Sequence, residues 1–330
     1  MSDVWPYFLL CILLVPTGCG HSSPGNLLSP PSLSSQEALA GRVVGGRESD
    51  PGTFPWMVGL LDSSGFNFCG GALIKSNYIL TAAHCLFNKR VEHLTAVIGH
   101  NDLDIAYLFN RVYRLRSMIL HPGFVPSNWS HDIALIKLVS PVLHLDPICL
   151  PERSQRYFDS LVVAGWGRTS SNSDPIKPSR LHQVSLPQVD QYFCEGTWAE
   201  NYVGPEQMCA GSAGKDTCIY DSGSPLMSFP HGYRRSSSSP SIASLAGITS
   251  FGSKRCGDPE KPGVYTRVAS YLDWIHANTR DSLCWLHLIL LVSPLFRQMP
   301  SFSSWVDDET SSNEEEWRKK VVIEGKMMRE

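Results

Sequence analysis

A serine at position 222 lies in a segment suited to present a nucleophile at a tight turn. Residues 216–226 read Asp-Thr-Cys-Ile-Tyr-Asp-Ser-Gly-Ser-Pro-Leu and are rich in types that tolerate tight backbone geometry. A serine hydroxyl is a weak nucleophile alone, so catalysis also requires a base and a group that orients this base. Ser222 is therefore a candidate nucleophile only if the chain supplies both groups.

Two upstream segments supply them. His84 lies in Thr-Ala-Ala-His-Cys at residues 81–85, and Asp132 stands at the head of the apolar run 133–136. An imidazole with an ordinary pKa of about 6.5 can take the Ser222 proton and return it to a leaving amine near neutral pH. A carboxylate that enters a buried strand needs a partner. The three residues predict nucleophilic catalysis, in the chain order His, Asp, Ser.

Composition narrows the class of protein. The chain has 330 residues, of which 42% are hydrophobic and 18% charged, as in an ordinary globular protein with a substantial core. A formal net charge of −3 argues against nucleic acid as a partner. Ten cysteines without paired Cys-x-x-Cys units indicate disulfides in an oxidising compartment rather than a zinc site. We predict no metal and no cofactor.

The apolar pattern predicts an all-β fold over residues 43–280. Short apolar and β-branched runs alternate with Gly, Pro, Asn and Ser turns, which is typical of barrels or sandwiches. The exception is 269–278, where Leu272 and Ile275 stand at helical spacing and predict a helix at the end of this region.

The amino-terminal segments predict a secreted precursor. An apolar run at 7–15 is followed by small residues, so we expect residues 1–18 to be a cleaved signal peptide. Residues 19–42 are rich in Ser, Pro and Gly and are expected to form a flexible pro-segment. The protein should therefore be extracellular.

Five landmarks in the right order resemble the trypsin-like (chymotrypsin-fold) secreted serine proteases. They are Arg-Val-Val-Gly-Gly at 42–46, the segments around His84, Asp132 and Ser222, and Lys-Pro-Gly-Val-Tyr-Thr-Arg at 261–267. The resemblance covers residues 43–280, which we take as the protease domain. It implies two packed six-stranded antiparallel β-barrels with a C-terminal helix and an active site in the cleft between the barrels.

The resemblance also implies a role for each site residue. Asp132 would orient His84, and the backbone N–H groups of Tyr220 and Ser222 would form the oxyanion hole. Asp216 would lie at the base of the primary pocket, so cleavage is expected after Arg or Lys. The other substrate-binding positions implied are Thr217, Ser250, Phe251, Gly252 and Gly263.

Activation is implied by the same resemblance. Cleavage after Arg42, by another trypsin-like protease or by the enzyme itself, would free the ammonium of Val43 to pair with buried Asp221. The intact precursor should then be nearly inactive. Expected partners are protein or peptide substrates and protein protease inhibitors.

Two residues depart from the family pattern. Tyr220 replaces a glycine, so its Cβ can disfavour the backbone conformation of the oxyanion hole, and its ring should crowd the leaving-group side. Ser224 also replaces a glycine, and we expect this exchange to matter little. An alternative interpretation follows from Tyr220: a catalytically impaired homologue that acts as a binding or scaffold protein.

The resemblance implies most of the disulfides. It pairs Cys69 with Cys85, Cys194 with Cys209 and Cys218 with Cys256. Cys149 matches a position that tethers the pro-segment, with Cys19 as its natural partner; if the signal is cut after Cys19, then Cys149 would meet Cys284 or stay free.

Two peripheral features complete the expectations. Asn128-Trp129-Ser130 is a glycosylation sequon close to Asp132, and we expect it to be used. Residues 281–330 are expected to be a disordered extension. Its apolar run, 283–296, is short and interrupted by His287 and Pro294, so we do not expect a membrane partner.

Overall fold

The computed structural model describes residues 18–21, 46–155, 161–167, 178–201, 203–217, 220–229, 242–253 and 255–280. All of its strands and helices belong to one compact unit, Val15–Thr279. Several predictions fall on residues outside the described ranges. They are those on the signal peptide, most of the pro-segment, Arg42, Val43, Cys218 and the extension beyond residue 280.

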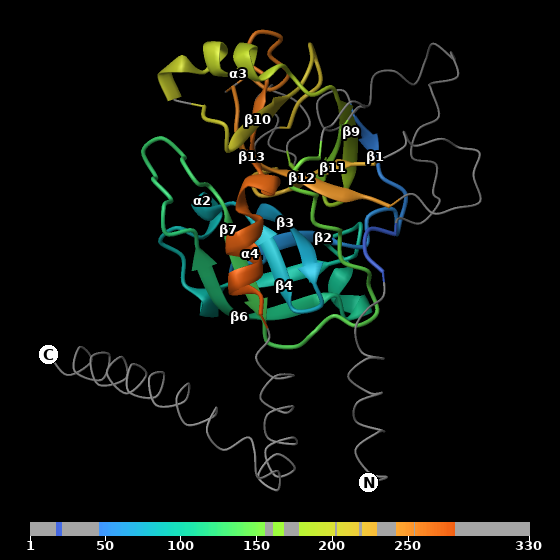
Figure 1. Ribbon diagram of the computed structural model, residues 1–330. Helices are drawn as coiled ribbons and strands as arrows, with labels where there is room; N and C mark the ends of the chain where they lie inside the picture. The colour runs from blue at the N-terminus through green and yellow to red at the C-terminus, as the bar shows by residue number, and fades with distance from the viewer. Residues whose placement is uncertain are drawn as a thin grey trace, which may run out of the picture. The chain divides into compact units, whose positions relative to one another are not determined.

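The first half of this unit is a closed six-stranded barrel (Figure 1). Its strands are β2 (Met57–Leu61), β3 (Asn67–Lys75), β4 (Tyr78–Thr81), β5 (Thr95–Ile98), β6 (Val112–Leu120) and β7 (Ala134–Leu138). They follow the order β2-β3-β4-β7-β6-β5, and each neighbouring pair is antiparallel. The expected first barrel is confirmed.

The second sheet contains seven strands, one more than predicted. They are β1 (Arg47–Glu48), β8 (Leu161–Gly165), β9 (His182–Leu186), β10 (Gln207–Ala210), β11 (Pro225–Ser228), β12 (Ser244–Phe251) and β13 (Gly263–Arg267). Their order is β1-β9-β8-β11-β12-β13-β10. The extra strand is two residues long and adds to the edge of β9 by pairing Glu48 with His182.

The second sheet curls so that the end of β9 meets the end of β10. A bridge joins Gln188, just after β9, to Ala210 at the end of β10. The Val189 N–H also donates to the Cys209 carbonyl at 2.9 Å. Six of the strands thus approach a second barrel, as the chymotrypsin fold requires, although the closing contact is a bridge rather than a ladder.

One hydrophobic cluster spans the two sheets, and a second cluster lies within the second sheet alone. Strands β2, β8 and β11 are buried along their whole length, which explains why they read as continuous apolar runs rather than alternating ones. Trp56 beside β2 donates its indole N–H to the sulfur of Met227 on β11 at 3.2 Å. Packing across the sheets therefore determines how the loops at their junction meet.

Short helices connect and cover the strands. The last elements in the described residues are the 3₁₀ turn η4 (Val268–Tyr271) and helix α4 (Leu272–Asn278), which matches the predicted helix. Trp274 packs against His121 of the first barrel, so the last helix returns across from the second sheet. The others are α2 (Ala83–Leu86), η1 (Val91–His93), η2 (Ala106–Phe109), α3 (Gln191–Thr197) and η3 (Ala199–Asn201).

Disulfides tie distant segments together. The structure contains the bonds Cys69–Cys85 and Cys194–Cys209. Cys256 is also disulfide-bonded, while Cys218, its expected partner, lies outside the described residues.

A further disulfide joins Cys19 to Cys149. Gly20 extends the attachment, because its N–H donates to Pro147 and its carbonyl accepts from Ala243. It adopts a φ of 72°, and a Cβ there would collide with the Ala243 backbone, so only glycine fits. The segment preceding the protease domain is thus anchored to it at this end.

Ser224 is a buried polar residue at the junction of the sheets. Its hydroxyl is buried and has no hydrogen-bond partner within the described residues. A Cβ at Gly70 would overlap with this hydroxyl, and one at Gly165 would lie 3.2 Å from it. The serine fits here only because these two neighbours are glycines. The presence of serine in place of the family's glycine therefore matters more than the small difference in size suggests.

Replacing Ser224 with alanine should stabilise the protein. An unpaired buried hydroxyl costs about 1–3 kcal/mol, so we expect Ser224→Ala to raise the free energy of unfolding by about 1 kcal/mol in urea denaturation. Thr81→Val is the matched control, since the Thr81 hydroxyl is buried and donates to the Gly70 carbonyl at 2.7 Å. That variant should lose about 1 kcal/mol. Equal destabilisation by both substitutions would contradict the prediction.

Candidate active site

A histidine and a buried aspartate form a tight pair at the junction of the sheets. His84 Nδ1 lies 2.7 Å from Asp132 Oδ2, and the His84 backbone N–H donates to Asp132 Oδ1 at 2.8 Å. Asp132 is buried, whereas the His84 side chain is partly exposed. This arrangement fixes the imidazole with Nδ1 toward the carboxylate and leaves Nε2 for other partners.

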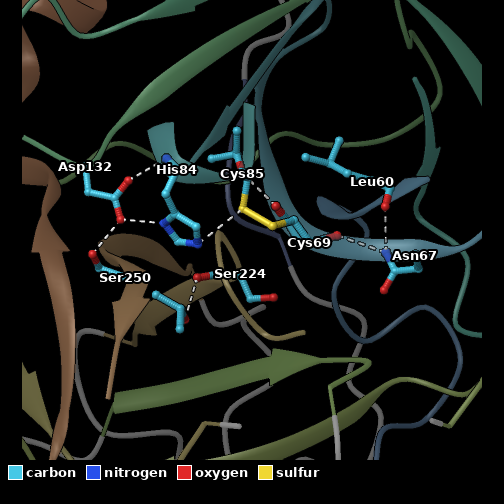
Figure 2. Close-up of a disulfide and its surroundings, with 11 residues drawn as sticks. Leu60, Asn67, Cys69, His84, Cys85, Asp132, Ser224 and Ser250 are labelled. Carbon is cyan, nitrogen blue, oxygen red and sulfur yellow. Dashed lines mark hydrogen bonds and ion pairs between the residues drawn. A yellow bond between two sulfur atoms is a disulfide. The ribbon is translucent and has the colours of Figure 1, made fainter. Parts of the chain in front are cut away.

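The surrounding covalent structure holds His84 in place. His84 lies in the short helix α2, and the next residue, Cys85, is bonded to Cys69 on β3. Figure 2 shows the imidazole between Asp132 and this disulfide, with Cys85 Sγ 3.7 Å from Nε2. The disulfide therefore limits movement of the segment that carries the histidine.

Asp132 is satisfied from the opposite sheet. Ser250 of β12 donates its hydroxyl to Asp132 Oδ2 at 2.5 Å, and Thr266 of β13 donates to the Asp132 carbonyl at 2.8 Å. The sequence predicts Ser250 only as a substrate-binding position, and it does not single out Thr266. Their hydroxyls lie more than 100 residues from Asp132 in the chain, so no local pattern signals the contacts.

Ser222 lies on the loop between Tyr220 and β11. The Ser222 carbonyl accepts a hydrogen bond from the Gly70 N–H at 2.8 Å. Gly70 directly follows Cys69, which is disulfide-bonded to Cys85, the residue after His84. The chain thus brings the serine backbone to the histidine segment. Within the described part of the chain the Ser222 hydroxyl forms no hydrogen bond to His84.

Glycine is required directly after the serine. Gly223 has a φ of 81°, and a Cβ there would overlap with the Thr81 hydroxyl. Its N–H donates to the Thr249 carbonyl at 2.8 Å. The tight turn expected from the sequence around Ser222 is therefore explained by close packing of this loop against β3, β4 and β12 and by a left-handed residue.

Asp221 is enclosed by backbone. Its carboxylate is buried and accepts the Gly167 N–H at 2.8 Å. A Cβ at Gly165 or Gly167 would overlap with the carboxylate oxygens. The two glycines therefore shape a pocket for this acid, while Val43, its proposed partner, lies outside the described residues.

Tyr220 adopts a backbone conformation that favours glycine. Its φ is 77°, in the left-handed region, which costs a bulky residue about 1–2 kcal/mol. Its ring meets that of Phe66 edge to face, with centroids 5.3 Å apart. The expected difficulty of placing tyrosine here is thus visible as a strained φ, and a ring contact accompanies it.

Asp216 is a buried acid with few donors. Its Oδ1 accepts from Thr217 N–H at 2.8 Å and its Oδ2 from Gly257 N–H at 3.3 Å. Burial is the main reason that its pKa is raised to about 7, while the two backbone donors oppose the rise. A Cβ at Gly263 would lie 2.7 Å from Oδ1, so the absence of a side chain there leaves room beside the carboxylate.

The remaining expected pocket residues lie near this acid or on β12. Thr217 is adjacent to Asp216, and its hydroxyl lies 3.3 Å from that of Tyr265. Phe251 ends β12, with its ring edge to face with Trp198 at 5.3 Å. Gly252 follows it, and a Cβ there would approach only Gly263, at 3.7 Å.

An aromatic residue also covers the histidine. Trp129 has a φ of 59°, and its ring centroid lies 4.2 Å from that of His84. The preceding Asn128 accepts the Ser130 N–H through its side-chain oxygen at 3.1 Å. The sequon thus lies in a turn beside the site, where a glycan would be close to its rim.

One group in the described residues has the spacing of metal ligands. Cys69, His84 and Cys85 have ligand atoms within 4.8 Å of one another. Both sulfurs are joined in a disulfide and supply no thiolate. This cluster therefore does not offer a metal site in its oxidised form.

The fold and the site define a serine protease of the chymotrypsin type, and comparison with known proteins agrees. A family model described as Trypsin matches residues 43–275. The chain is similar to the structure of neuropsin, a serine protease expressed in the limbic system of mouse brain, with 31% identity and a TM-score of 0.60. The match covers 71% of this chain and 99% of that one. The chain belongs to the trypsin family.

No helix in the described ranges has the length and apolar character needed to cross a membrane.

Removing the Ser250 hydroxyl should weaken both the fold and the site. A hydrogen bond to a charged group contributes about 1.5–3 kcal/mol, so we expect Ser250→Ala to lower the free energy of unfolding by this amount near neutral pH. Denaturation in urea would measure it. Unchanged stability would show that Asp132 does not depend on this donor.

Proposed function

We propose that this protein is a secreted zymogen of a serine endopeptidase that hydrolyses peptide bonds after Arg or Lys. The observation that supports it best is the buried Asp132 carboxylate held against His84 Nδ1, next to the strand that contacts Ser222. The Cys19–Cys149 bond supports secretion, because such bonds persist in oxidising compartments. Substrates would be proteins or peptides, and protein inhibitors are expected partners.

The proposed reaction passes through an acyl-enzyme. Ser222 Oγ attacks the scissile carbonyl carbon while its proton moves to His84 Nε2. His84 then gives this proton to the departing amine, the C–N bond breaks, and the acyl group remains as an ester on Ser222. Water repeats the sequence to release the acid, and Asp132 stabilises the imidazolium in both halves.

The specificity proposal depends on Asp216. Its buried carboxylate receives two backbone N–H groups, and the space beside it is kept open by Gly263. An Arg guanidinium could donate to both oxygens, and a Lys ammonium would pair with the charge less directly. Because burial raises the pKa of Asp216, a cation bound beside it would stabilise the ionised carboxylate.

Activation is proposed to work through Asp221. Cleavage after Arg42 by a trypsin-like protease, or by the enzyme itself, would create an ammonium at Val43 that pairs with Asp221 in its glycine-walled pocket. The new ammonium would hold Asp221, and with it the loop that carries Ser222, in the conformation required for catalysis.

A second candidate function remains a binding or scaffold role with impaired catalysis. Tyr220 favours it, because its φ of 77° strains the residue whose N–H would stabilise the oxyanion. Loss of one such donor costs about 100- to 1,000-fold in rate. The complete set of His84, Asp132 and Ser222 favours the enzyme.

The first test is hydrolysis of an Arg-p-nitroanilide peptide. We expect activity in protein cut after Arg42 and almost none in the uncut form, since pairing of Val43 with Asp221 is required. Ser222→Ala should reduce kcat by a factor of at least about 1,000. Circular dichroism would show that all forms are folded. Folded, correctly cut protein without activity would favour the binding role.

Ligand binding to the pocket should depend on pH through Asp216. A bound cation stabilises the carboxylate, so a free-state pKa of about 7 means that binding at lower pH must first ionise the acid. From about pH 8 to about pH 6, the affinity for benzamidine should fall about tenfold.

Asp216→Ser provides the control for this experiment. For this variant, calorimetry should show weaker benzamidine binding with little pH dependence, and the preference for cleavage after Arg should be lost. A wild-type affinity that rises as pH falls would contradict the assignment of Asp216.

A further inference from the structure

Asp132 stands at the centre of a tight three-residue turn. The Ile133 N–H donates to the His131 carbonyl at 2.8 Å, and a bond between residues two apart closes a turn of this kind. His131, directly before Asp132, has a φ of 51° in the left-handed region. A residue with a side chain keeps such a conformation only when its surroundings hold it there. The direction of the Asp132 carboxylate therefore depends on what holds His131.

The His131 side chain is held by the segment that follows the second sheet. Its Nδ1 lies 3.0 Å from the hydroxyl of Tyr271, a buried residue at the end of η4. The two rings meet edge to face, with centroids 5.9 Å apart. Burial raises the pKa of Tyr271, so its hydroxyl keeps the proton that this hydrogen bond can use. A buried tyrosine thus fixes the residue that precedes Asp132.

A second histidine, directly after β6, supports the ring of His131. His121 stacks on it with centroids 5.0 Å apart and an interplanar angle of 20°. The rings of Tyr271 and Trp274 each lie 5.2 Å from that of His121. The Gly123 N–H donates to His121 Nδ1 at 3.1 Å, which requires an unprotonated nitrogen, and burial accordingly lowers the pKa of His121. A neutral, packed ring therefore limits movement of the His131 side chain.

The same part of the chain also holds the other side of Asp132. Thr266 on β13 lies five residues before Tyr271 and donates its hydroxyl to the Asp132 carbonyl at 2.8 Å. The Asp132 carboxylate makes separate hydrogen bonds at the far end of its side chain (Figure 2). Asp132 is therefore restrained on both sides through its backbone, independently of the bonds that its carboxylate makes.

We infer that a tether between His131 and Tyr271 positions Asp132 for catalysis. The inference rests on the proposed function and adds two positioning residues to it. Asp132 must face His84 Nδ1 to stabilise the imidazolium that forms during each half of the reaction. Without the tether the turn at Asp132 relaxes, and the carboxylate loses this direction. The chemical step then slows, while the pocket at Asp216 still binds substrate.

The first test is Tyr271→Phe, which removes only the hydroxyl. With an Arg-p-nitroanilide peptide and the activated protein, kcat should fall at least about tenfold, because misplacement of a catalytic group by about 1 Å costs up to about 100-fold. KM should stay unchanged, since the tether does not contribute to substrate binding. A kcat equal to that of the wild type would overturn the tether.

A double-mutant cycle tests whether the two side chains act as one unit. His131→Ala, Tyr271→Phe and the double variant should have the same kcat, because the second substitution removes nothing further. Losses that multiply in the double variant would show independent effects and overturn the tether. His131→Gly should be as slow as His131→Ala, since glycine adopts the left-handed φ but cannot reach Tyr271. A kcat restored by glycine would assign the effect to the backbone alone and contradict the inference.

Thr279→Val is the matched control for lost stability. Thr279 is buried directly after α4 and donates its hydroxyl to the Ile275 carbonyl at 2.8 Å. This variant therefore also loses one buried hydrogen bond, and its midpoint of urea unfolding should fall as that of Tyr271→Phe does. Its kcat should be unchanged. An equal loss of kcat in Thr279→Val would assign the effect of Tyr271→Phe to general destabilisation and overturn the tether.

Proton NMR tests the tether without turnover. In a Ser222→Ala background, the measured signal is that of the imidazole proton between His84 Nδ1 and Asp132, which His84→Ala identifies by its loss. Tyr271→Phe should shift this signal toward that of an imidazole in water, because the hydrogen bond to the carboxylate weakens. An unchanged signal would overturn the tether. Absent hydrolysis by the wild type, together with the expected shift, would refute the proposed function alone.

Discussion

The buried carboxylate of Asp132 is the constraint on which the site depends. Removing this charge from water is costly unless it is fully hydrogen-bonded, and the partners of the carboxylate come from two elements. The segment at α2 provides two contacts through His84, and β12 provides the Ser250 hydroxyl. Because Ser250 belongs to the second sheet, the histidine is oriented only when both sheets pack correctly. Packing of the two sheets therefore orients the histidine as the protein folds.

Close approach of backbone is the second feature of this junction. Gly70, Gly165, Gly167 and Gly223 each occupy a position where a Cβ would overlap with a neighbouring polar group. The space left by the first three admits the Asp221 carboxylate and the Ser224 hydroxyl. The first is hydrogen-bonded by backbone, and the second has no partner in the described ranges, so similar burial has opposite energetic consequences.

Tyr220 connects the loop that carries Ser222 to the first barrel. A tyrosine at a φ of 77° is unfavourable by itself, yet its ring gains a contact with Phe66 on the first barrel. Tyr220 therefore combines a strained φ with a contact that ties its loop to the first barrel. The proposed protease and the alternative binding protein differ only in whether the backbone N–H stays aligned despite this strain.

The fold class and the closing helix were predictable from the sequence because apolar periodicity is a local signal, and short motifs nominated His84, Asp132 and Ser222 as candidates. The sequence did not indicate the two-residue β1 or the bridge that closes the second sheet, since both depend on the edges left exposed after folding. Three features could be seen only in the folded protein: Ser250 supports Asp132, Phe66 meets Tyr220, and the Ser224 hydroxyl has no partner among the described residues. These contacts join residues far apart in the chain, and their energies arise from burial and geometry that no local pattern encodes.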